Sequence, residues 1–112
     1  MGDGGDITNY QVTVNNGSNS YGSGNKFYID GTMMSTLELN EGTHKFLQND
    51  TSNSTHPFRL STTPNGTHGE GSEYTDGVTY GGIPGNGNGS YTQIVVTNST
   101  PSLYYYCKNH SG

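Results

Sequence analysis

Near its carboxyl end the chain reads Leu103-Tyr104-Tyr105-Tyr106-Cys107-Lys108-Asn109-His110-Ser111. Aromatic residues are enriched in β-strands, and side chains of a strand alternate between its two faces, so Leu103, Tyr105 and Cys107 share one face and Tyr105 is expected to pack inward. The only cysteine of the chain therefore ends a predicted strand, and a histidine follows it three positions later. We expect a sulfur ligand and an imidazole to lie close together at the end of one strand.

Short segments with the same alternation of apolar and polar residues recur along the chain, separated by turn-forming residues. The predicted strands cover residues 7–14, 26–31, 36–39, 43–47, 56–61, 91–97 and 102–107. In the segment 56–61, His56 lies on the same face as Phe58 and Leu60, so this histidine is predicted to face the core. About seven short strands, with no sustained helical period, predict an all-β fold, an antiparallel sandwich or barrel.

Length and composition predict one domain spanning residues 1–112. A chain of 112 residues and 12.0 kDa has room for one ordinary core. Only 27% of the residues are hydrophobic, and 62 of the 112 are Gly, Ser, Thr, Asn or Pro, which favour turns and strands. Residues 15–24 are predicted to form a polar turn. Residues 62–89 are predicted to form a long glycine-rich loop of low order, in which 74–80 is the only strand-like piece.

Charge and hydropathy exclude several classes of function. The net charge is −5 and the chain has only four Lys and Arg residues, so we expect no nucleic-acid partner. No apolar run approaches the roughly 20 residues that span a bilayer, and the acidic, glycine-rich start is unlike a signal peptide. A single cysteine excludes an internal disulfide.

The residues that carry chemistry are His56, Cys107 and His110. Two imidazoles and one thiolate form the ligand set of a trigonal blue-copper site, and the same set suits zinc with an open fourth position, which would imply hydrolysis. His44 and His68 have no partner motif and are interpreted as ordinary polar residues. No catalytic triad, carboxylate pair or phosphate loop is present, so no enzymatic step is assigned.

Four segments carry a resemblance to a known family: residues 28–31, 37–42, 56–58 and 103–111. Together they resemble a cupredoxin domain of the plastocyanin and amicyanin type. The resemblance covers nearly the whole chain and implies a Greek-key β-sandwich that binds one type 1 copper ion through His56, Cys107 and His110. It also implies electron transfer with a redox partner protein. Copper chemistry favours an oxidising location: extracellular, periplasmic, or on a cell or virion surface.

Two features depart from that family. The family has a weak axial methionine after the second histidine, and its shortest spacing places this residue one position beyond Gly112, so we expect a longer chain or an altered site. Pro57 follows the first histidine, where relatives often donate a backbone N–H to the sulfur, and proline has none to donate. We expect this to lower the reduction potential. The alternative function is a structural or adhesive module of a surface, virion or filament, with a dispensable metal site and with copies of itself or other surface proteins as partners.

Overall fold

The computed structural model describes residues 7–34, 36–87 and 89–112. Within these residues the chain forms seven strands and two short 3-10 turns, and the all-β prediction is confirmed. The strands are β1 (Ile7–Asn19), β2 (Gly22–Ile29), β3 (Gly42–Leu47), β4 (Phe58–Ser61), β5 (Val78–Gly81), β6 (Tyr91–Val96) and β7 (Tyr104–Cys107). The 3-10 turns are η2 (Thr51–Asn53) and η3 (Gly66–Gly69). No helix in the described ranges is long and apolar enough to cross a membrane.

Five strands form one sheet in the order β2-β1-β3-β6-β5, and β4 pairs with β7 in a second sheet. All pairs are antiparallel except β1 and β3, which run parallel, so the large sheet is mixed rather than purely antiparallel. The chain leaves the β1–β2 hairpin and crosses over to place β3 on the free side of β1. A parallel pair requires such a crossover, and alternation within each strand cannot reveal it.

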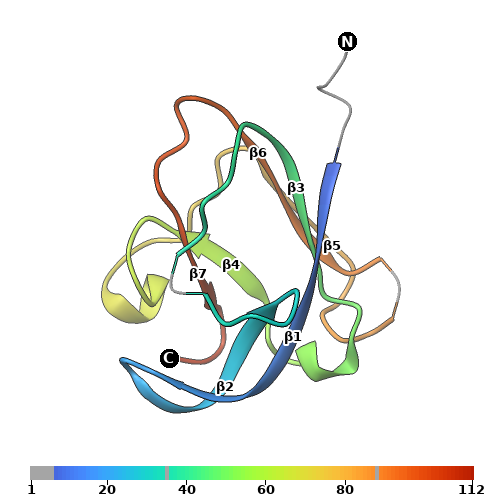
Figure 1. The fold of residues 1–112 in the computed structure, drawn as a ribbon, viewed down its shortest axis with the longest axis vertical. Coiled ribbons are helices and arrows are strands. Elements are labelled where there is room, and N and C mark those ends of the chain that lie inside the picture. The colour runs from blue at the N-terminus through green and yellow to red at the C-terminus, as the bar shows by residue number, and fades with distance from the viewer. Residues whose placement is uncertain (1–6, 35, 88) are drawn as a thin grey trace.

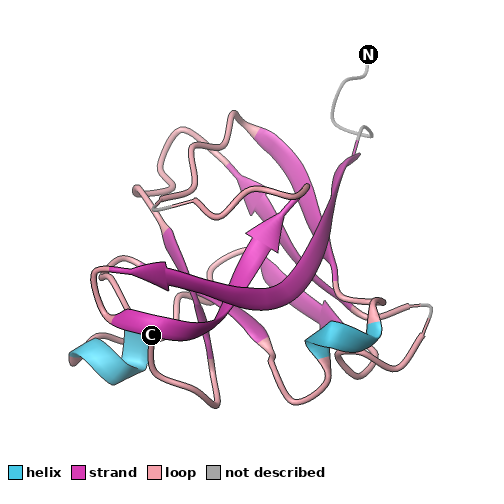
Figure 2. Cartoon of the chain, turned by 60° about the horizontal axis from the view of Figure 1, so that its bottom comes forward, coloured by secondary structure: helices cyan, strands magenta, loops and turns pink. Residues whose placement is uncertain are grey.

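The β1–β2 hairpin is longer than predicted. The polar turn expected over residues 15–24 is wrong, because β1 continues to Asn19 and pairs through Asn19 with Gly22, leaving Ser20 and Tyr21 as the turn. Polar residues extend a strand here because the ladder is made by backbone groups, which need no apolar side chains. The hairpin curves away from the sheet towards the C-terminus (Figure 2).

The core lies between the two layers of strands. In Figure 1 β4 and β7 lie across from β1, β3 and β6, and the space between them is filled by apolar side chains. Phe46, Phe58 and Tyr105 form a stack, with ring centroids 4.9 Å apart for Phe46 and Phe58 and 5.3 Å apart for Phe58 and Tyr105. The inward packing of Tyr105 is therefore confirmed. The buried cluster is Val12, Phe27, Ile29, Leu37, Phe46, Phe58, Leu60, Ile94, Val96 and Leu103.

Two further predictions are corrected. Residues 36–39 do not form a strand, since their pairing is one bridge between Leu37 and Leu103, although Leu37 is buried as the alternation predicts. The stretch 62–89 is not a loop of low order, because it contains η3 and β5 in its described part. Backbone bonds attach it to the sandwich: the amide of Tyr74 donates to the carbonyl of Leu60, and that of Val95 donates to Gly77. Glycine density therefore marks tight turns here.

Candidate metal centre

His56 is positioned by the segment between η2 and β4. Its amide donates to the carbonyl of Asn53, which ends η2, and Pro57 follows it and restricts it to extended backbone. The residue is 9% exposed, and its ring packs edge-on against Phe27, with centroids 6.5 Å apart. The prediction that His56 lies on the core side of this segment is confirmed.

Cys107 and His110 come from the end of β7 and the turn after it. Register pairs Cys107 with Phe58, two residues after His56, so the neighbouring strands bring the cysteine beside the histidine. The amide of Lys108 donates to the carbonyl of Pro57, and the side chain of Asn109 donates to the carbonyl of Thr55. These two hydrogen bonds continue the pairing of β4 with β7 beyond the ends of both strands, and they hold in place the turn that carries His110.

The three predicted ligands converge, and their candidate ligand atoms all lie within 4.8 Å of one another. The Cys107 Sγ is 3.6 Å from Nδ1 of His56 and 3.3 Å from Nδ1 of His110, so both rings present the same nitrogen. With metal–sulfur and metal–nitrogen bonds of about 2.3 and 2.0 Å at a tetrahedral angle, sulfur and nitrogen would be about 3.5 Å apart. The cluster therefore fits one metal ion with little movement of its side chains.

Protonation in this cluster follows from burial. Burial raises the pKa of the Cys107 thiol above its ordinary value, although hydrogen bonds from the amides of Asn109 and His110 and the charge of Arg59 act in the opposite direction. Burial lowers the pKa of His56, and the charge of His110 adds to this shift. His56 is therefore neutral at neutral pH, the form that binds metal, and metal binding must displace the proton of the thiol.

Pro57 has no N–H to donate to the sulfur, as the sequence requires. The lower reduction potential expected from this residue stays a prediction.

His68 and Gln48 support the cluster and were not found from the sequence. Nε2 of His68 lies 2.8 Å from the carbonyl oxygen of Cys107, and because a carbonyl only accepts, this nitrogen carries the hydrogen. Gln48 contacts the backbone on both sides of Pro57. Neither residue has a motif near it. Their partners are backbone groups, 8 and 10 positions away in the sequence for Gln48 and 39 positions away for His68, and no sequence motif marks such contacts.

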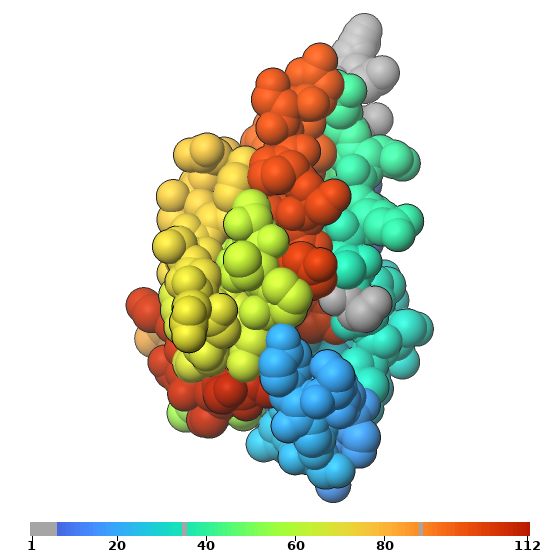
Figure 3. Space-filling view, turned by 90° about the vertical axis from the view of Figure 1, so that its left-hand side faces the viewer, coloured from blue at the N-terminus to red at the C-terminus, as the bar shows by residue number. Residues whose placement is uncertain are grey.

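A cavity of about 480 Å³ opens beside the cluster. All three candidate ligands line it, together with Met33 and Met34 from the segment after β2. The C-terminal segment closes one side, where the carbonyl of Gly112 accepts hydrogen bonds from Lys26 and Asn19. In Figure 3 the tip of the β1–β2 hairpin (blue), the segment after β4 (yellow-green) and the C-terminal segment (red) gather on one face.

This donor set and its geometry are compatible with a metal site. A comparison with known proteins finds no matching family model, no matching curated protein and no matching solved structure.

Proposed function

We propose that the chain binds one copper ion through Nδ1 of His56, Sγ of Cys107 and Nδ1 of His110, and that it carries single electrons. The observation that supports this most is the convergence of one sulfur and two imidazole nitrogens within 4.8 Å, from segments about fifty residues apart in the chain. Three ligands of this softness suit both Cu(I) and Cu(II), and a bound copper would supply a one-electron couple. A cupredoxin-type identity is part of this proposal.

The burial of the cluster also suits electron transfer. His56 is nearly buried and Cys107 half-buried, whereas His110 is exposed at the surface. Ligands that are largely buried limit the rearrangement of water when the charge of the site changes. The exposed ring of His110 would then be the place where electrons enter and leave, and a redox partner protein would dock there. We assign no enzymatic step, and we expect the chain to work in an oxidising compartment.

The test is titration of the purified apo protein with Cu(II), followed by visible absorption and electron paramagnetic resonance. A thiolate–copper bond gives an intense visible band, and we expect saturation at one copper per chain. Cys107→Ser should abolish the band. His44→Gln is the matched control, because it removes an imidazole of β3 that lies outside the ligand set.

Three outcomes separate the alternatives. A visible band lost in Cys107→Ser and kept in His44→Gln supports the copper proposal. Tight zinc binding without a copper band supports a zinc site, for which the open cavity offers room for a water ligand. A chain that binds neither metal and associates with itself supports the structural surface module and contradicts the redox proposal.

A further inference from the structure

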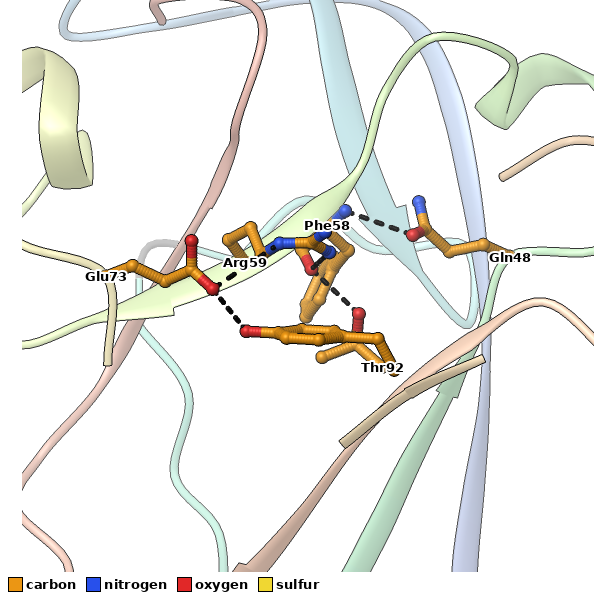
Figure 4. A network of polar contacts seen from close by, with 6 residues as sticks. Gln48, Phe58, Arg59, Glu73 and Thr92 are labelled. Carbon is orange, nitrogen blue, oxygen red and sulfur yellow. Dashed lines mark hydrogen bonds and ion pairs between the residues drawn. The ribbon is translucent and has the colours of Figure 1, made fainter. Parts of the chain in front are cut away.

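Gln48 lies directly after β3 and is 1% exposed. Its side-chain oxygen accepts the amide of Phe58 at 3.0 Å, and its side-chain nitrogen donates to the carbonyl of His56 at 2.7 Å. These two backbone groups flank Pro57. The side-chain amide of Gln48 therefore binds this segment in the way that a backbone peptide group of a neighbouring strand would. Figure 4 shows the bond between Gln48 and Phe58.

Other groups hold Gln48 itself in place. Its side-chain nitrogen also donates to Oδ1 of Asn53, which is fully buried, and Nδ2 of Asn53 donates to the carbonyl of Val12 in β1. The backbone amide of Gln48 donates to Ser90, and its carbonyl accepts the amide of Gly85. Every polar group of Gln48 thus has a partner, and such a satisfied buried network is rigid.

The opposite edge of the same segment is held by the residue that follows β7, because the carbonyl of Pro57 accepts the amide of Lys108. His56 therefore lies on a short extended segment that is bonded from both sides, and Pro57 fixes its own φ. His110 differs, since it lies exposed in a turn. One ring of the cluster is rigidly held and the other is more free to adjust.

We propose that Gln48 is a positioning residue that holds His56 in its coordinating place before any metal arrives. The inference rests on the proposed metal site for its effect on affinity, but the placement of His56 in the apo protein is independent of metal. Outer residues that orient metal ligands typically change affinity by 10- to 100-fold when they are lost. Gln48 acts through the backbone of His56 and touches no ligand atom.

The test compares Gln48→Met with Thr92→Val. Methionine has a similar length to glutamine but cannot bond His56 or Phe58. Thr92 is the matched control: it is fully buried in β6, and its hydroxyl donates at 2.7 Å to the carbonyl of Phe58, the residue whose amide Gln48 binds (Figure 4). Both variants lose buried hydrogen bonds, so both should unfold at a lower denaturant concentration. Only Gln48→Met should weaken Cu(II) binding, by roughly tenfold or more, in competition with a chelator.

The second readout is nuclear magnetic resonance of the metal-free protein. In Gln48→Met we expect broadened or shifted ring signals of His56 and faster hydrogen exchange of the Phe58 amide, while Thr92→Val keeps the His56 signals of the parent chain. Unchanged His56 signals in a folded Gln48→Met variant would overturn the proposal, as would equal copper affinities of the two variants.

If Gln48→Met does not fold, a second variant is needed. Gln48→Glu keeps an acceptor for the amide of Phe58 but, when ionised, cannot donate to His56. We expect the Phe58 amide to stay protected while the ring signals of His56 change; unchanged ring signals contradict the proposal. If the parent chain binds no copper, the proposed function fails, and the metal-free measurements still decide the role of Gln48.

Discussion

Tyr106 packs its ring against the backbone of Gly66, so the last strand lies beneath the turn η3. A methyl group added at Gly66 would come within 2.6 Å of Cγ in that ring, and Gly66 has φ +48°. Tyr106 is only 4% exposed, although it points to the face opposite Tyr105. The turn after β4 therefore covers the outer face of β7, the strand that delivers Cys107.

Replacing Gly66 with alanine should lower the free energy of unfolding by about 1–3 kcal/mol, because the methyl group forces the Tyr106 ring or the turn to move. Gly87→Ala is the control, since Gly87 also has positive φ but a methyl group there meets nothing within 4 Å. Urea unfolding of both variants measures the difference. A loss in Gly66→Ala no larger than that in Gly87→Ala would show that the ring makes room at no cost.

Glu73 links two residues on the outer side of β4. The hydroxyl of Tyr80 donates to Glu73, whose carboxylate is 3.6 Å from Nε of Arg59, and the guanidinium lies 3.9 Å above the Tyr80 ring (Figure 4). We expect Glu73→Gln to cost about 1 kcal/mol, because a mostly buried cation loses its counter-charge. Glu38→Gln, at an exposed position, should change stability by less than about 0.5 kcal/mol. Equal unfolding midpoints in urea for these two variants would contradict the role of Glu73.

Alkaline pH should destabilise the fold through four tyrosines whose pKa is raised. Burial raises the pKa of Tyr80, and its hydrogen bond to Glu73 adds to this; burial is also the main cause of the raised pKa of Tyr10, Tyr105 and Tyr106. The unfolded chain loses these protons near pH 10.0 while the folded chain keeps them, so their contribution is complete below that pH and is lost above it. Urea midpoints measured upward from about pH 8 should fall beyond about pH 10, with a smaller fall in Tyr80→Phe. A flat profile would be incompatible with these shifts.

Copper should raise the thermal stability of the parent chain, since a ligand that binds only the folded state stabilises it. At a free concentration a hundred times the dissociation constant, the gain is about 2.7 kcal/mol. Calorimetry with and without Cu(II) measures this shift, and a chelator should reverse it. Cys107→Ser should lose most of the response. A melting temperature that copper raises equally in both proteins would place the binding elsewhere.

Local alternation accounts for the parts of the fold that the sequence predicts well. The patterns over residues 43–47 and 91–97 match β3 and β6 closely, because one face of each strand is buried and the other is not. The same rule fails over residues 15–19, where polar residues extend β1 because their backbone groups pair with β2. It also fails over residues 36–39, where the side chains alternate but the backbone pairs with another segment at one bridge only. Which strands pair depends on distant partners.

The sequence by itself determined the chemistry of the candidate site: one thiol, a histidine three residues after it, and a second histidine in line with apolar residues of another strand. Residue type and spacing are local properties, so they can be recognised without a fold. Only the tertiary structure decided that these side chains meet, because the pairing of β4 with β7 sets the distance from His56 to Cys107. It also decided the support from Gln48 and His68, since contacts between a side chain and a backbone group depend on how the chain between them folds.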